Sequence, residues 1–187
     1  CLGKDKKVII MSVGGLVDGY AELEGLIKRS NGQLHIPSGA VCGIDGILAA
    51  RESSISEVTL TTRKPVKGLR GAPYFIHKGI DLDEITKETV VFDGSASQAI
   101  RYFPKNINVA AVLSIAGIGV DKTRVRIITS PRYTNNSHEI SAQGVFGKLT
   151  ARTDNVPSPA NPKTSYLAIL AAEAVLRKIS SAVKIGS

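Results

Sequence analysis

Residues 6–13 form the continuous stretch KKVIIMSV, which follows a charged turn and ends at Gly14 and Gly15. The uncharged run from Val8 to Val13 within it is typical of a strand that is buried on both faces of a parallel sheet. Residues 18–30 come next with apolar side chains at helical spacing, and residues 34–37 predict a second short strand. A β, α, β order with a right-handed crossover places both strands in one parallel sheet.

This order is the one found in the last part of a doubly wound nucleotide-binding domain, so we expect residues 1–43 to be the C-terminal, rear part of a Rossmann-type domain. The glycine fingerprint of such a domain is absent, because Gly14-Gly15 lacks its spacing and Gly117 and Gly119 follow a predicted helix. We interpret these residues as turn glycines. We expect the phosphate-binding part of the domain to precede Cys1.

A different pattern begins at Ile44, where helices and strands are mixed. The helical segments are expected over residues 44–51, 95–103 and 108–116, and the strands over residues 57–62, 124–128 and within 138–149. This mixture predicts an α+β domain with a mixed sheet over residues 44–160. Residues 161–187 are expected to form a terminal amphipathic helix, over about residues 162–183, that packs back toward the nucleotide domain.

Composition excludes several classes of protein. With 187 residues, 43% of them hydrophobic, the chain has enough apolar material for a sizeable core. Its longest apolar runs are too short to span a membrane. The two cysteines, Cys1 and Cys42, indicate reduced thiols and a cytoplasmic location. The three histidines stand far apart in the sequence, without cysteines or paired carboxylates nearby, so we expect no metal site.

The formal net charge of +8 indicates an anionic ligand. A nucleic-acid partner is not expected, because the basic residues are scattered, aromatic residues make up only 5% of the chain and no recognition motif appears.

Four segments carry side chains suited to ligand binding. Ser38 lies in a glycine-containing strand-to-helix turn, at the edge where open α/β sheets bind ligands. Asn108 begins an apolar helix and either caps it or supplies a hydrogen bond to a ligand. His138 lies in a polar turn that enters a strand, where it is either an exposed histidine or a group for proton transfer.

The fourth segment is the approach to the terminal helix. Asn161 fits the position of the helix cap and Pro162 the first helical position. The free amides of that first turn, together with Lys163, Thr164 and Ser165, then form an anion site. A plain helix start without a ligand is the alternative.

Five motifs occur in the order and spacing of one family: IPSGA (36–40), FDGSA (92–96), NINVAA (106–111), NSHEI (136–140) and NPKTS (161–165). On these motifs the chain resembles the L-aspartate dehydrogenase family over nearly its whole length. The resemblance implies a Rossmann-type domain followed by an α+β domain that is both catalytic and the site of homodimer formation. It also implies NAD or NADP as cofactor and a dicarboxylic amino acid as substrate, with neither nucleic acid nor membrane as partner.

The resemblance further implies roles for three residues. His138 matches the family's active-site histidine, Asn108 matches an asparagine that binds NAD, and Cys42 stands where the family usually has an Ala or Gly that contacts NAD. The expected reaction is the NAD(P)-dependent oxidation of L-aspartate to iminoaspartate, or the reductive amination of oxaloacetate, which feeds NAD biosynthesis.

For the two substrate carboxylates we expect Lys163, Thr164 and Ser165 as partners, with Ser38 as a further candidate. Two alternatives stay open at this point. One is a related dehydrogenase of another anionic amino acid or of a semialdehyde, and the other is a truncated, non-catalytic dimerisation module.

Overall fold

The computed structural model describes residues 2–104, 107–162 and 164–186. The strands are β1 (Lys7–Ile9), β2 (Gln33–His35), β3 (Ile55–Pro65), β4 (Thr89–Ser95), β5 (Arg124–Ser130), β6 (Ser137–Gly144) and β7 (Gly147–Asp154). The α-helices are α1 (Tyr20–Lys28), α2 (Ile44–Arg51), α3 (Pro73–Lys78), α4 (Ala96–Tyr102), α5 (Asn108–Ala116) and α6 (Tyr166–Ser180). Three short 3-10 helices complete the described part: η1 (Leu2–Lys4), η2 (Val13–Gly19) and η3 (Val66–Gly68).

The N-terminal unit is a parallel two-stranded sheet whose strands β1 and β2 are connected by η2 and α1. This confirms the β, α, β order expected from the sequence. Strand β1 is shorter than the apolar run, because Val13 leaves the strand direction and begins η2. There its side chain, 1% exposed, packs against Ala111 and Val112 of α5.

The second unit is a five-stranded mixed sheet with the order β4-β5-β3-β6-β7. Strand β3 runs parallel to β5 and antiparallel to β6, while the remaining pairs are antiparallel. A mixed sheet in an α+β arrangement is therefore confirmed. The register places Thr62 of β3 opposite His138 of β6, and Lys64 opposite Thr129 of β5.

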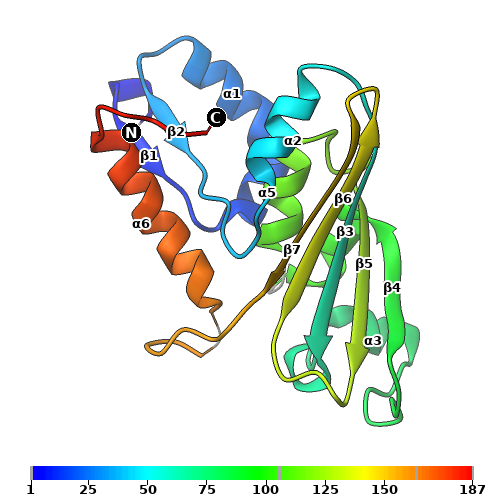
Figure 1. Ribbon diagram of the computed structural model, residues 1–187. Helices are drawn as coiled ribbons and strands as arrows, with labels where there is room; N and C mark the ends of the chain where they lie inside the picture. The colour runs from blue at the N-terminus through cyan, green and yellow to red at the C-terminus, as the bar shows by residue number, and fades with distance from the viewer. Residues whose placement is uncertain (1, 105–106, 163, 187) are drawn as a thin grey trace.

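The main core lies between one face of this sheet and helices α2, α3, α4 and α5 (Figure 1). Val58 and Leu60 of β3 and Ile140 of β6 point to that face, and each is at most 1% exposed. Since side chains alternate along a strand, the opposite face carries the intervening polar residues. On that face Arg63 Nη1 lies 3.3 Å from Glu139 Oε2.

Helix α5 joins the two units. Leu113 belongs to the main core, whereas Ala111 and Val112 pack with Val13 and the partly buried Leu16 of η2. A helix with packing partners on several sides needs apolar residues around most of its circumference, which is the composition of NVAAVLSIA. The helix therefore fixes the end of β1 relative to the five-stranded sheet.

Helix α6 begins at Tyr166, so the expectation that it starts at Pro162 was wrong. The backbone before it is paired instead: Ser158 N donates to Thr164 O, and Tyr166 N donates to Val156 O. Pro157 and Ser165 form an isolated bridge, and Thr164 N donates to Asn161 O, so α6 begins only after this turn.

Farther along, α6 lies beside the two-stranded sheet (Figure 1), with Val175 and Ile179 bordering a groove against Leu34 of β2. The expected domain limits at residues 43 and 160 stay a prediction. Within the described part of the chain, no helix has both the length and the apolar character needed to cross a membrane.

Candidate functional site

The candidate site is a cavity of about 310 Å³ between the N-terminal unit and the five-stranded sheet. Its wall is made of the segments after β1 and β2, the start of α5, the C-terminal end of β3, the N-terminal end of β6, and the start of α6. The residues that line it are Met11, Ser12, Val13, Pro37, Ser38, Gly39, Ala40, Lys64, Ile107, Asn108, Val109, Val112, Asn136, His138, Thr164, Ser165 and Ala168. The carboxyl ends of both parallel strands thus open into it, which is where α/β sheets bind their ligands.

His138 is held in this cavity by the cross-strand pair with Thr62. Its Nδ1 lies 3.0 Å from Thr62 Oγ1, and the residue is 5% exposed. Burial, and to a lesser extent the nearby charge of Lys64, lowers the pKa of the imidazole to about 3. A neutral ring, oriented by a hydroxyl, is therefore available to a ligand across the physiological pH range.

Lys64 lies two residues after Thr62 on the same face of β3, and sequence reasoning missed it. It is 7% exposed, and burial lowers the pKa of its ammonium to about 8. The strand expected over residues 57–62 in fact continues to Pro65. The alternation Val58, Leu60, Thr62 was the available signal, because one further step places residue 64 on the buried face.

Asn108 connects α5 to the end of β1. Its Oδ1 accepts a hydrogen bond of 3.0 Å from the backbone N–H of Gly14. The residue is the first of α5, and it lines the cavity. Asn106, which the sequence favoured as the cap of this helix, lies outside the described residues.

Ser38 also lines the cavity, in a loop that is tied to β7. Gly39 has a φ of +72°, a conformation that favours glycine. Two side chains donate to the carbonyl oxygen of Ala40: Thr153 Oγ1 at 2.9 Å and Asn155 Nδ2 at 3.0 Å. These bonds fix the loop at the mouth of the cavity.

Cys42 is not among the residues that line the cavity. Its thiol is free and exposed, and Sγ donates to Arg152 O over 3.5 Å. A contact between this residue and a cofactor stays a prediction.

Thr164 and Ser165 line the cavity from the segment that precedes α6, where Ser165 forms an isolated bridge with Pro157. The helix starts only after them, with Ser165 as the residue before its first turn and no capping bond from its side chain. The expected anion site in the first turn of the helix is therefore wrong in its geometry. Lys163 lies outside the described residues.

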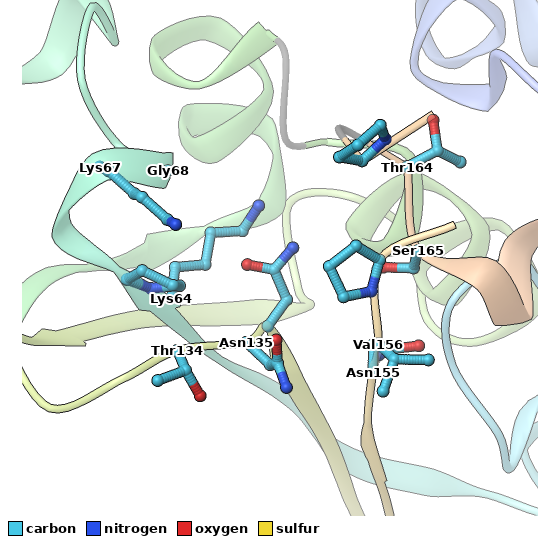
Figure 2. Close-up of a pocket in the computed structure, with 13 residues that line it drawn as sticks. Lys64, Lys67, Gly68, Thr134, Asn135, Asn155, Val156, Thr164 and Ser165 are labelled. Carbon is cyan, nitrogen blue, oxygen red and sulfur yellow. The ribbon is translucent and has the colours of Figure 1, made fainter. Parts of the chain in front are cut away.

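A second, larger cavity, shown in Figure 2, has a volume of about 470 Å³ and adjoins the first. The two share Lys64, Asn136, Thr164 and Ser165 in their walls. Figure 2 shows Lys64 and Lys67 on one side of the larger cavity and Thr164 and Ser165 on the other. Asn135, Asn136 and Asn155 complete its polar wall, and no sequence motif had singled out these residues as ligands.

Among the described residues, no group of three or more His, Cys, Asp or Glu side chains is placed to hold a metal ion. The side chains that line the two cavities supply imidazole, ammonium, amide and hydroxyl groups.

Comparison with known proteins gives three results. Residues 45–179 match the family model described as aspartate dehydrogenase, C-terminal. L-aspartate dehydrogenase of Methanosarcina mazei is 52% identical over 96% of the chain, and that of Nitrosopumilus maritimus is 44% identical over 94%. The crystal structure of aspartate dehydrogenase from Thermotoga maritima superposes with a TM-score of 0.76 at 26% identity, over 96% of the chain. The chain spans 67%, 65% and 68% of the lengths of these three proteins, respectively.

Proposed function

Because the chain belongs to the aspartate dehydrogenase family, we propose that it oxidises L-aspartate to iminoaspartate with NAD or NADP. The observation that carries this proposal is the position of His138, a buried and neutral imidazole in a cavity at the carboxyl ends of β1 and β2. The family implies a pyridine nucleotide, while the choice between NAD and NADP is part of the proposal.

The residues around the smaller cavity fit the nicotinamide end of such a cofactor. Its volume of about 310 Å³ lies at the lower end of the range for ligand pockets. Ser12, Ser38 and Asn108 offer hydroxyl and amide groups for a carboxamide, and the backbone of Gly39 at φ +72° permits close approach. We propose that these residues hold the ring, beside the apolar surface of Met11 and Val13.

In the proposed reaction, one hydrogen leaves the substrate's Cα with the bonding electron pair, and the amino nitrogen loses a proton as the C=N bond forms. A bound pyridine nucleotide supplies the acceptor for that hydride. We propose that Nε2 of His138 accepts a hydrogen bond from the amino group and then takes its proton. Its Nδ1 pairs with Thr62, so the ring is held in one orientation.

Binding of a carboxylate near Lys64 strengthens this role. The charge of Lys64 contributes to the low pKa of His138, so an anion beside the ammonium raises that pKa and makes the imidazole a better base. Substrate binding thereby raises the pKa of His138, the group that takes the proton of the substrate.

We further propose that the enzyme is a homodimer of the cytoplasm that serves pyridine nucleotide biosynthesis. The free thiol of Cys42 supports a reducing compartment. The face of the five-stranded sheet opposite the core supports self-association, because it carries paired charges such as Arg63 and Glu139. Light scattering tests this, with a mass twice that of one full-length chain expected.

The test of the catalytic proposal is His138→Asn, which keeps a polar side chain but removes the base. We expect kcat for aspartate to fall about 100-fold or more, which is the usual contribution of a general base. The control is His77→Asn, since His77 is an exposed residue of α3 that lines neither cavity. An unchanged kcat in His138→Asn would remove His138 from this role.

A further inference from the structure

The charged side chains that line the two adjoining cavities are all positive among the described residues. Lys64 and Lys67 line the larger one and Lys64 also lines the smaller one, whereas no Asp or Glu occurs among the described residues that line either of them. Lys64 is buried and Lys67 is exposed, so one ammonium lies at the junction of the cavities and the other near the solvent. Such a lining selects a negatively charged group.

We propose that Lys64, assisted by Lys67, binds the side-chain carboxylate of the substrate in the larger cavity and so selects a dicarboxylic amino acid. This inference rests on the proposed function and specifies which residues recognise the acidic side chain. In this arrangement the amino group lies toward His138 in the smaller cavity, and the carboxylate extends past Lys64 into the larger one.

Asn155 gives a second reason to expect a polar ligand in the larger cavity. The residue is 4% exposed, and its Nδ2 is engaged with Ala40 O and Thr153 Oγ1. Its Oδ1 is buried without a hydrogen-bond partner, and the residue lines the larger cavity. A buried acceptor of this kind is satisfied by an N–H or O–H donor, so a polar ligand is expected in the larger cavity.

The energetics favour Lys64 over the surface lysine as the main determinant. A buried ammonium has lost much of its hydration, so a carboxylate that enters the cavity forms a charge-assisted hydrogen bond with it in a medium of low dielectric constant. The exposed Lys67 contributes less, because solvent screens its charge.

The test compares L-aspartate with L-asparagine, which has the same shape but a neutral side chain. Their dissociation constants are measured by titration calorimetry with the full-length protein and saturating NADH or NADPH, so that no turnover occurs. We expect aspartate to bind about 10- to 100-fold more tightly than asparagine, which is the range for a hydrogen bond to a charged group. In Lys64→Met this preference should fall to about one, through weaker aspartate binding alone.

The control is Lys78→Met, because Lys78 is exposed at the end of α3 and lines neither cavity. It should keep the wild-type preference. Thermal unfolding reports whether Lys64→Met is folded. Should it not fold, Lys67→Met replaces it and should reduce the preference several-fold, since an exposed side chain can be changed without loss of the core.

An equal affinity for the two amino acids in the wild type, or a preference that survives both substitutions, overturns the inference. Failure of the proposed function is a separate outcome. A protein that oxidises no aspartate but keeps a Lys64-dependent preference retains the carboxylate site without the reaction. A protein that oxidises aspartate with a preference independent of Lys64 and Lys67 retains the reaction without this site.

Discussion

His138 and Lys64 are both buried on one face of the five-stranded sheet. The free-energy cost of charging a buried group determines the protonation state of each of them. Burial lowers the pKa of His138 to about 3 and that of Lys64 to about 8. The imidazole is therefore neutral where an exposed histidine would titrate, and the lysine keeps its proton at neutral pH. A neutral acceptor beside a cation suits a substrate that carries both an amino group and a carboxylate.

The low pKa of His138 predicts how stability depends on pH. Between about pH 6.5 and pH 3 the imidazole of His138 is protonated in the unfolded chain but neutral in the folded protein. The free energy of unfolding therefore falls as the pH falls. The loss is at most about 1.4 kcal/mol per pH unit. His138→Asn removes this contribution.

Urea unfolding of the wild type and of His138→Asn at about pH 6.5 and about pH 4.5 measures it. The stability of the wild type relative to the variant should decrease by roughly 1–2 kcal/mol at the lower pH, since the other titrating groups are common to both proteins. A constant difference would mean that the pKa of the imidazole is the same in the folded protein as in the unfolded chain.

Several residues of the cavity were identifiable before the structure. Ser38, Asn108, His138, Thr164 and Ser165 all line it, and each belongs to a motif of the family. Lys64 and Asn155 could not be identified in this way, because neither lies in a motif. Their importance depends on burial and on the cavity between segments far apart in the sequence, which periodicity alone does not reveal.

At the scale of elements, the contact between η2 and α5 decides where the end of β1 lies. Gly14 donates its backbone N–H to Asn108 Oδ1, and the absence of a side chain lets the two segments approach. A Cβ at Gly14 would overlap with Cγ2 of Ile107. The neighbouring Gly15 has no atom of the rest of the chain within 4 Å of such a Cβ.

Gly14→Ala and Gly15→Ala are therefore a matched pair. We expect Gly14→Ala to lower the free energy of unfolding by about 1–3 kcal/mol, as overpacking does, and to raise KM for the nucleotide because the loop moves at the cavity wall. Gly15→Ala should change the free energy of unfolding by no more than about 0.5 kcal/mol. Denaturant unfolding and steady-state kinetics of both variants decide this, and equal effects would contradict the packing argument.

Local pattern was sufficient for some elements and not for others. Helices α2 and α5 have the bounds that their apolar spacing indicates. Helix α6 starts later than its Asn161-Pro162 sequence indicates, because the bridge between Pro157 and Ser165 holds the preceding segment in extended pairing. That bridge forms because the chain folds back between Pro157 and Ser165. A helix-cap motif does not predict such a contact.

At the scale of the whole molecule, the function depends on the meeting of two sheets. The parallel pair β1 and β2 directs its carboxyl ends at the cavity, while the five-stranded sheet contributes His138 and Lys64. Helix α5 packs against both units and holds them in place. Neither sheet alone contains the residues that the proposed reaction needs, so the site exists only in the assembled fold.

The most direct test of this account is the steady-state reduction of NAD and NADP by the full-length protein with different substrates. We expect reduction that depends on L-aspartate, with a kcat/KM at least about tenfold above that for L-alanine, L-glutamate or aspartate semialdehyde. A higher kcat/KM for another of these substrates would contradict the assignment of aspartate. The absence of reduction with all four would contradict the dehydrogenase itself.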